Sequence, residues 1–230
     1  MPRLLDLSQE IYQGMYVYPG HLKTVVWDHH LHEETAKNFE GGMSYASKGL
    51  LMSDHGPTHV DAISHLDPRA GAPAIDAMAL ETFYGPATCL DLSRKEPQSY
   101  ITAEDMDAAS DGSGAALERG DILLLRTGAY EARYGTPDYL SQYPGLDEGA
   151  SQWLVDNGVK SFGVDCPSPD NPISKTYPCH MMCRANGITH IENLANLDQL
   201  VGRRFTFIGF PLRVRGGTGS PIRAVAVLED

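Results

Sequence analysis

The alternation of apolar and polar residues predicts a series of short strands, separated by turns rich in glycine, proline and asparagine. Strands are expected at Leu4–Leu7, Val25–Leu31, Tyr45–Ser53, Ala87–Leu92, Ile122–Arg126, Phe162–Val164, Ile188–Glu192, Thr206–Phe210 and Ala224–Leu228. Strands and helices are mixed without a regular βαβ spacing and without an internal repeat. This pattern is typical of an α/β protein.

Apolar residues at helical spacing predict fewer and shorter helices. They are expected at Ala74–Phe83, Thr102–Ala109, Asp147–Asn157 and Pro178–Asn186. Thr102 and Asp105 suit a helix start, while Gly158 and Gly187 suit helix ends. Tyr130–Leu140, which contains glycine and proline, is expected to be irregular. No linker interrupts the chain, so residues 1–230 are predicted to form a single α/β domain.

The richest chemistry lies between His55 and His65, where three histidines and one aspartate all have odd numbers. A helix would place Asp61 roughly 200° around the axis from His59, and Gly56-Pro57 disfavours a helix. In a strand, His59 and Asp61 share one face, and a Gly-Pro bend can fold His55 back over them. Two imidazoles and a carboxylate then form an incomplete ligand shell for a divalent metal.

The same pattern has a simpler explanation, a polar strand on a solvated surface. Three histidines and an aspartate on one face, opposite apolar residues, favour the metal site instead. His65 lies further along and is expected to approach the open side as a proton carrier. A second histidine cluster, His29, His30 and His32, is disfavoured as a metal site because adjacent strand residues point to opposite faces.

Composition narrows the range of partners and locations. The formal net charge of −12 gives no basic surface for nucleic acid or an anionic membrane. The start of the chain has no apolar segment of signal-peptide length, and no later run approaches a membrane span. Four cysteines are few for a disulfide scaffold, so a cytoplasmic protein is expected.

Two further stretches leave alternatives open. Gly216–Pro221 lacks the lysine and the following helix of a phosphate loop, so it is expected either to line a substrate pocket or to connect two strands. Cys179 and Cys183 could hold zinc with His180, but buried free thiols are the favoured interpretation. A distant pair such as His180 and Glu192 would suit the incomplete shell described above.

These residues resemble the cyclase family of metal-dependent hydrolases, which includes bacterial kynurenine formamidase and isatin hydrolase. The family motif His-x-Gly-Thr-His-x-Asp-x-Pro-x-His corresponds to residues 55–65, with Pro57 and Ile63 as departures. The resemblance extends over nearly the whole chain. It is carried also by Asp6-Leu7-Ser8, Arg126-Thr127-Gly128, Gly163-Val164-Asp165, Ser168, Asp170, the His180 to Glu192 spacing, and Arg223-Ala224-Val225.

The resemblance implies a swivelling β/β/α fold and a site of one or two zinc or manganese ions. His55, His59 and Asp61 would hold one ion, and Asp61 would bridge to a second held by His180 and Glu192. His65 would be the catalytic acid and base. Homodimers or homotetramers are expected, with N-terminal segments completing the neighbour's site.

The implied activity is hydrolysis of a carbon–nitrogen amide bond by metal-activated water, in a small aryl formamide or a cyclic amide. Two alternatives stay open: a metal-dependent lyase, dehydratase or cyclase, and a non-catalytic metal-binding protein. Tyr18, Trp27 and Phe39 on the early segments are candidate contacts for an aromatic substrate, and Ser220 is a fourth candidate.

Overall fold

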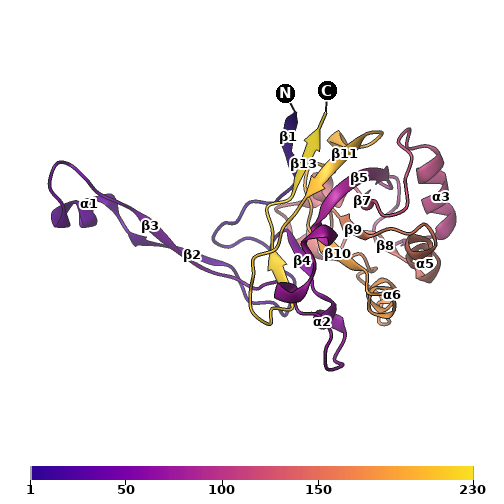
Figure 1. Ribbon diagram of the computed structural model, residues 1–230, viewed down its shortest axis with the longest axis horizontal. Helices are drawn as coiled ribbons and strands as arrows, with labels where there is room; N and C mark the ends of the chain where they lie inside the picture. The colour runs from indigo at the N-terminus through magenta and orange to yellow at the C-terminus, as the bar shows by residue number, and fades with distance from the viewer. Residues whose placement is uncertain (1, 230) are drawn as a thin grey trace.

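The computed structural model describes residues 2–229, and its centre is one nine-stranded mixed sheet (Figure 1). The strand order is β1-β13-β11-β5-β7-β9-β10-β4-β12, with β5, β7, β9 and β10 parallel and the other neighbours antiparallel. Its strands are β1 (Arg3–Asp6), β4 (His59–Asp61), β5 (Tyr84–Asp91), β7 (Ile122–Arg126), β9 (Ser161–Val164), β10 (Thr189–Glu192), β11 (Arg204–Ile208), β12 (Gly219–Pro221) and β13 (Val225–Leu228). The expected α/β class and single domain are confirmed.

Helices lie in the connections between the parallel strands and pack on one face of the sheet. They are α3 (Ala103–Asp111), α4 (Ala129–Arg133), α5 (Glu148–Asp156) and α6 (Pro178–Asn186). A short helix, α2 (Ile63–Leu66), follows β4 and packs against α6. Because α3, α5 and α6 each join two parallel neighbours, the centre of the sheet is built from βαβ units after all. The expectation of no βαβ spacing is therefore wrong for this part of the chain, where residues 92–121, 127–160 and 165–188 form successive connections between parallel strands. A small parallel sheet, β6 (Tyr100–Ile101) with β8 (Gly145–Leu146), lies in two of them.

The sheet separates two hydrophobic cores. Alternate residues of β7 show this, since Leu124 joins one cluster and Leu123 the other. The helix-side cluster includes Trp153 of α5 and Cys183 of α6. The opposite cluster takes residues from strands at both ends of the sheet, so the sheet curls around it. A strand covered on both faces is apolar throughout, which explains the unbroken Ile-Leu-Leu-Leu run of β7.

Helix ends follow the expected chemistry. Thr102 accepts a hydrogen bond from the Asp105 backbone N–H, and the Asp105 side chain returns to the Thr102 backbone. Gly187 ends α6 in the left-handed conformation, with φ of 66°.

Two predictions about helices were wrong. Ala74–Phe83 is not a helix but two short 3-10 turns, η2 (Ile75–Ala77) and η3 (Leu80–Phe83), because Met78 between them is extended. Tyr130–Leu140 is not wholly irregular, since it contains most of α4 and the turn η4 (Pro137–Leu140). A third short turn, η5 (Leu197–Gln199), follows β10.

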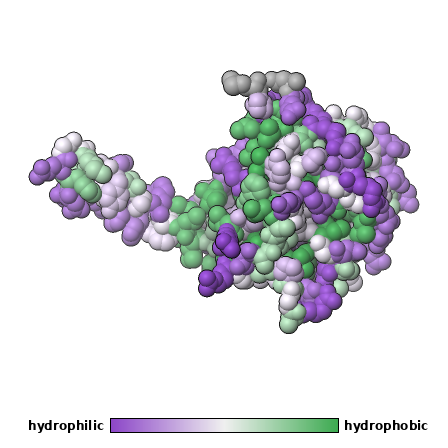
Figure 2. All heavy atoms as spheres, viewed as in Figure 1, coloured by the Kyte–Doolittle hydropathy of each residue, from purple (hydrophilic) through white to green (hydrophobic). Residues whose placement is uncertain are grey.

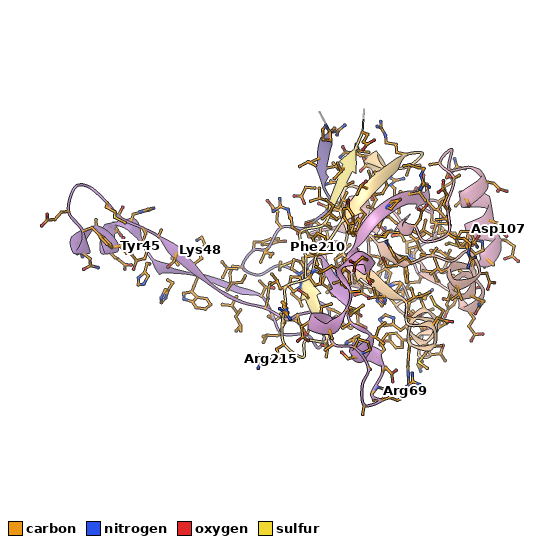
Figure 3. The ribbon with its side chains drawn as sticks, in the orientation of Figure 1. Tyr45, Lys48, Arg69, Asp107, Phe210 and Arg215 are labelled. Carbon is orange, nitrogen blue, oxygen red and sulfur yellow. The ribbon has the colours of Figure 1, made fainter. Side chains whose placement is uncertain are left out.

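A hairpin projects from the body as an arm, which we define as residues 25–51 (Figure 1). It consists of β2 (Val25–His30), β3 (Ser47–Leu51), and α1 (His32–Thr35) and η1 (Ala36–Asn38) at its tip. Tyr45 and Lys48 mark its course in Figure 3. A two-stranded hairpin has no core of its own and is marginally stable alone. No helix among residues 2–229 is long and apolar enough to cross a membrane.

Candidate metal centre

Strand β4 presents His59 and Asp61 on one face and Val60 on the other. Val60 and Ala62 are buried in the core cluster, while the His59 and Asp61 side chains face the opposite way and converge. His59 Nε2 lies 3.3 Å from Asp61 Oδ1. The bend at Gly56-Pro57 returns His55, whose Nδ1 lies 2.8 Å from the same oxygen. The structure therefore brings His55, His59 and Asp61 together.

Strand β10 lies antiparallel to β4, with Glu192 directly opposite His59. Glu192 Oε2 is 3.4 Å from His59 Nε2. His180 comes from the first turn of α6, and its Nε2 lies 3.9 Å from both Asp61 Oδ2 and Glu192 Oε1. The register of β10 against β4 therefore brings Glu192, from late in the chain, next to the ligands of residues 55–61.

A sixth side chain, His190, was missed by the sequence reasoning. It lies on β10 two residues before Glu192, so strand alternation places both on the same face. That spacing was the signal that could have identified it. His190 Nε2 is 3.4 Å from Asp61 Oδ2 and 3.3 Å from Glu192 Oε1.

Together these side chains form two groups suited to metal ions. The first group is His55, His59 and Asp61, and the second is Asp61, His180, His190 and Glu192. Asp61 belongs to both groups through its two oxygens. All six residues are buried, and imidazole and carboxylate donors suit zinc and manganese.

Neighbouring groups orient the imidazoles. The Nδ1 of His59 donates to the Pro57 carbonyl at 2.9 Å, which leaves its Nε2 lone pair directed at the cluster. Asp170 accepts from the backbone N–H groups of Cys179 and His180 and pairs with His180 Nδ1. The buried Nε2 atoms of His59 and His190 have no hydrogen-bond partner within residues 2–229. Imidazole nitrogens and carboxylate oxygens that converge without hydrogen bonds to these two atoms suit a divalent cation bound between them.

The pKa values of the cluster's side chains show that its carboxylates favour positive charge at this place. Burial alone raises the pKa of Asp61, but the surrounding imidazoles of His190, His55 and His59 hold it well below its ordinary value. Burial lowers the pKa of His59, and Asp61 and Glu192 outweigh this and raise it. The pKa values of His180 and His190 are raised in the same way, by Asp170 and Asp61 among others.

The stretch at residues 216–221 contacts His55 of the first ligand group. Thr218 Oγ1 bonds His55 Nε2 at 2.9 Å and donates to Asp54 Oδ2. Gly219 of β12 pairs with Asp61 and packs against the His55 ring, where an added Cβ would come within 2.8 Å of Cε1. Of the two alternatives for this stretch, the structure shows a strand connection that braces a ligand group.

His65, at the end of α2, lies beside the cluster but outside both groups. Its side chain is 29% exposed, and its Nε2 is 3.7 Å from Asp61 Oδ2. Its ring centroid lies 4.0 Å from that of His55. Burial lowers the pKa of His65, so its imidazole is neutral at neutral pH and able to accept a proton.

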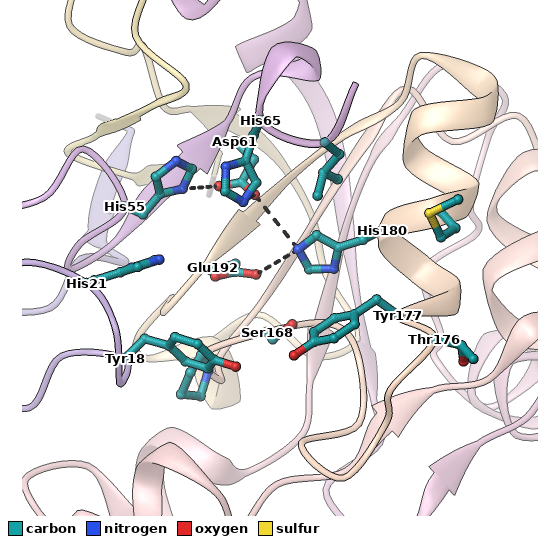
Figure 4. A pocket seen from close by; sticks show the side chains of 13 residues that line it. Tyr18, His21, His55, Asp61, His65, Ser168, Thr176, Tyr177, His180 and Glu192 are labelled. Carbon is teal, nitrogen blue, oxygen red and sulfur yellow. Dashed lines mark hydrogen bonds and ion pairs between the residues drawn. The ribbon is translucent and has the colours of Figure 1, made fainter. Parts of the chain in front are cut away.

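A pocket of about 380 Å³ opens onto the cluster (Figure 4). His55, Asp61, His65, His180 and Glu192 form one side of it. Tyr18 and Tyr177 face them from the other side, and Tyr177 was not among the predicted residues. Hydrogen bonding to Tyr177 and burial raise the pKa of Tyr18 to about 12, so its hydroxyl stays protonated. Tyr177 has a left-handed backbone with φ of 49°, a strained conformation for a bulky residue.

Three predicted substrate contacts lie outside this pocket. Trp27 is on the arm opposite Gly49, and Phe39 follows the turn at the arm's tip. Ser220 is fully buried, and its Oγ accepts from the Leu212 backbone N–H and donates to the Pro221 carbonyl. The Ser220 hydroxyl bonds backbone groups rather than substrate because β12 pairs with β4 and buries it. Of the four predicted substrate contacts, only Tyr18 lines the pocket of about 380 Å³.

The remaining candidates from the sequence are also placed. His29, His30 and His32 lie on the arm, outside both ligand groups. Cys179 and Cys183 are buried free thiols, as favoured.

The fold and the site together define a mixed α/β protein with a buried pair of His and carboxylate ligand groups beside a pocket. The profile of the family described as "Putative cyclase" matches residues 5–171. The chain therefore belongs to this cyclase family, as its motifs indicated.

Proteins similar to this chain are known by sequence and by structure. The kynurenine formamidase of Salinibacter ruber is 30% identical over 222 residues, covering 96% of each chain. That of Bacillus mycoides is 29% identical over 221 residues, covering 96% of this chain and 95% of its own. Isatin hydrolase A from Labrenzia aggregata, bound to benzyl benzoate, has a TM-score of 0.86 at 24% identity and covers 100% of this chain and 94% of its own.

Metal affinity is expected to fall as the pH falls from 8 to 6. The ligands bind metal in their neutral or anionic forms, and the raised pKa values of His59, His180 and His190 mean that protons compete already above the ordinary histidine range. Competition with a chromophoric chelator should show at least about a tenfold weaker affinity at pH 6. The same dependence is expected in His29→Gln, a histidine of the arm. An affinity that does not change with pH would contradict the assignment of the ligands.

Proposed function

We propose that this protein is a divalent-metal-dependent hydrolase that breaks a carbon–nitrogen amide bond in a small molecule. The observation that carries the proposal is one carboxylate, Asp61, shared by two buried ligand groups at the side of a pocket, with a neutral imidazole next to them. The related kynurenine formamidases and isatin hydrolases both act on such bonds, which supports the same bond type here.

The proposed metal is zinc or manganese, with one or two ions per chain, because two groups of ligand side chains share Asp61. When bound, such an ion supplies Lewis acidity, which lowers the pKa of water and polarises a carbonyl group. His55, His59, Asp61, His180 and Glu192 would hold it.

The residues outside the ligand groups move protons and orient the substrate. His65 accepts a proton from the attacking water at its imidazole and donates one to the leaving nitrogen, since its neutral form can do the first and its charged form the second. The hydroxyl of Tyr18, which stays protonated, and that of Tyr177 lie on the opposite side of the pocket and can contact the substrate. A carbonyl compound between these two sides would have its scissile bond next to His65.

Two substrate classes fit this chemistry, an acyclic aryl formamide such as N-formylkynurenine and a cyclic amide such as isatin. N-formylkynurenine carries an amino-acid carboxylate, for which arginine or lysine is the usual partner. Neither residue type is among the residues that line the pocket in the described part of the chain. This observation favours the uncharged cyclic amide.

The test is elemental analysis of protein purified without chelator, together with hydrolysis of isatin and N-formylkynurenine before and after chelation. We expect zinc or manganese to be present and isatin opening, with gain of one water, to be abolished by chelator and restored by metal. Metal with hydrolysis of neither compound would contradict the substrate classes. Loss of water or proton exchange without hydrolysis would indicate a lyase instead.

The arm supports a proposal about assembly. Along it, Trp27, Leu50 and Leu51 are each about half exposed, at 47%, 50% and 49%, although they are apolar. Figure 2 shows hydrophobic surface where the arm meets the body. Apolar side chains exposed together on a hairpin without a core fit burial against another protein. The proposed partner is a second copy of this chain, in a homodimer or homotetramer, in the cytoplasm, with neither nucleic acid nor membrane as a partner.

Replacing Trp27 and Leu50 together with serine is expected to dissociate the oligomer. Light scattering after size-exclusion chromatography should show the mass of the wild type fall to that of one chain, because the variant loses apolar area from the interface. Lys48→Ser on the same hairpin removes only an exposed pair with Asp28 and should leave the mass unchanged. A wild-type monomer, or an oligomer unaffected by the double substitution, would contradict the proposal.

A further inference from the structure

His190 stands apart from the other ligand candidates because it lies beneath the cluster rather than at the pocket. It does not line the pocket of about 380 Å³ that opens onto the cluster, whereas His180 and Glu192 do. Its side chain is 1% exposed, and it comes from the central part of β10. A histidine at this depth is either a structural residue with satisfied hydrogen bonds or a group that needs an ion.

The surroundings of its Nε2 argue against satisfied hydrogen bonds. Two carboxylate oxygens, Asp61 Oδ2 and Glu192 Oε1, lie 3.4 and 3.3 Å away. Even so, Nε2 makes no hydrogen bond to any of the residues that the structure describes. Two carboxylate oxygens and a buried imidazole nitrogen that share no hydrogen bond need a positive charge among them. A metal ion would satisfy all three atoms at once, whereas a proton on Nε2 has no aligned acceptor among residues 2–229.

The separations match the edges of a coordination shell. Four ligand atoms arranged tetrahedrally at zinc distances lie about 3.4 Å from one another. In the second group the neighbouring ligand atoms are 3.3 to 3.9 Å apart. His190 thus lies at the distance expected of a ligand to the same ion as Asp61, His180 and Glu192.

The other side of the ring holds it in this orientation. His190 Nδ1 lies 3.6 Å from Cys183 Sγ, and the ring stacks on Phe162 with an interplanar angle of 26°. An imidazole that binds metal through Nε2 carries its proton on Nδ1, where a sulfur acceptor from α6 is in place.

We infer that His190 is the fourth protein ligand of the second group and closes it, while the first group keeps three protein ligands and an open position. A site with four protein ligands is typical of a tightly held ion, and a site with three is typical of an ion that exchanges a position with water or substrate. This inference rests on the proposed function for the presence of metal, and it assigns unequal roles to the two positions.

The experiment compares two substitutions at one position. His190→Asn keeps a polar group near the place of Nδ1 but cannot reach the ligand position. His190→Gln places its amide oxygen near Nε2. Metal-free wild type and both variants are titrated with Zn²⁺ by calorimetry and with Co²⁺ by visible absorption, which is strong for four-coordinate Co²⁺ and weak for six-coordinate Co²⁺.

We expect wild type to bind two equivalents, the tighter one with the strong Co²⁺ spectrum. In His190→Asn that equivalent should weaken at least about 100-fold and lose its strong spectrum, and His190→Gln should recover part of the affinity. Melting temperatures of the metal-free proteins test the fold separately. Unchanged stoichiometry and spectra in a folded His190→Asn variant would overturn the inference. The readout needs no substrate, so failure to hydrolyse amides would contradict the proposed function and leave this result standing.

Discussion

Replacing Asp61 with alanine is expected to remove bound metal and to abolish hydrolysis. Asp61 is the one residue common to both ligand groups, with Oδ1 near His55 and His59 and Oδ2 near His180 and His190. Without its negative charge, four imidazoles converge with only Glu192 to offset a divalent cation. Activity should fall by at least about 10³-fold, since the loss of metal removes several kcal/mol of transition-state stabilisation. Elemental analysis and a substrate assay on the same preparation measure both effects.

Asp61→Asn is the matched control for shape. The amide has nearly the same volume and keeps one oxygen, but it carries no charge, so it separates the need for charge from the need for packing in a residue that is only 4% exposed. We expect this variant to fold and still to lose most of its metal. Full metal occupancy in either variant would contradict the bridging role of Asp61.

Replacing His65 with alanine is expected to leave metal bound and to lower turnover by about 10²- to 10⁴-fold, the usual range for a lost general acid and base. His65 lies outside both ligand groups, and its partly exposed side chain faces the pocket. The variant should also lose the limb of the pH–rate profile that reports the imidazole, whose pKa is lowered by burial. Metal analysis, kcat and the pH profile together make the measurement.

His21→Asn is a suitable comparison, because His21 also lines the pocket and contacts the His55 ring but belongs to neither ligand group. Its effect on kcat should be much smaller than that of His65→Ala. If His65→Ala lost as much metal as Asp61→Ala, the division between ligand and proton carrier would be wrong.

Local chemistry made part of this site predictable. Strand alternation requires His59 and Asp61 to share a face, and the Gly-Pro bend allows His55 to return, so the first ligand group was expected from eleven residues. The same reasoning applied to Thr-His-Ile-Glu would have paired His190 with Glu192. Helix starts such as Thr102 with Asp105 also depend on neighbours in the chain.

Other features depend on contacts between distant segments. The register of β10 against β4 places Glu192 opposite His59, and no local pattern specifies that pairing. Burial of Ser220 follows from the packing of β12, and the position of Trp27 follows from a hairpin that leaves the body. The expected helix at 74–83 is two short turns because Met78 is extended between them, and the Ile75 N–H at the start of the first turn donates to the distant Gly217 carbonyl.

The sequence by itself determined the class of the fold, most strands, the ligand types and the first ligand group, because periodicity and spacing act over a few residues. The resemblance to a family added His180 and Glu192. Only the tertiary structure decided that His190 joins them beside Asp61, and that Tyr177 faces this group. The physical reason is that a strand register and a helix position are fixed by burial of two cores on opposite faces of the sheet, a property of the whole chain.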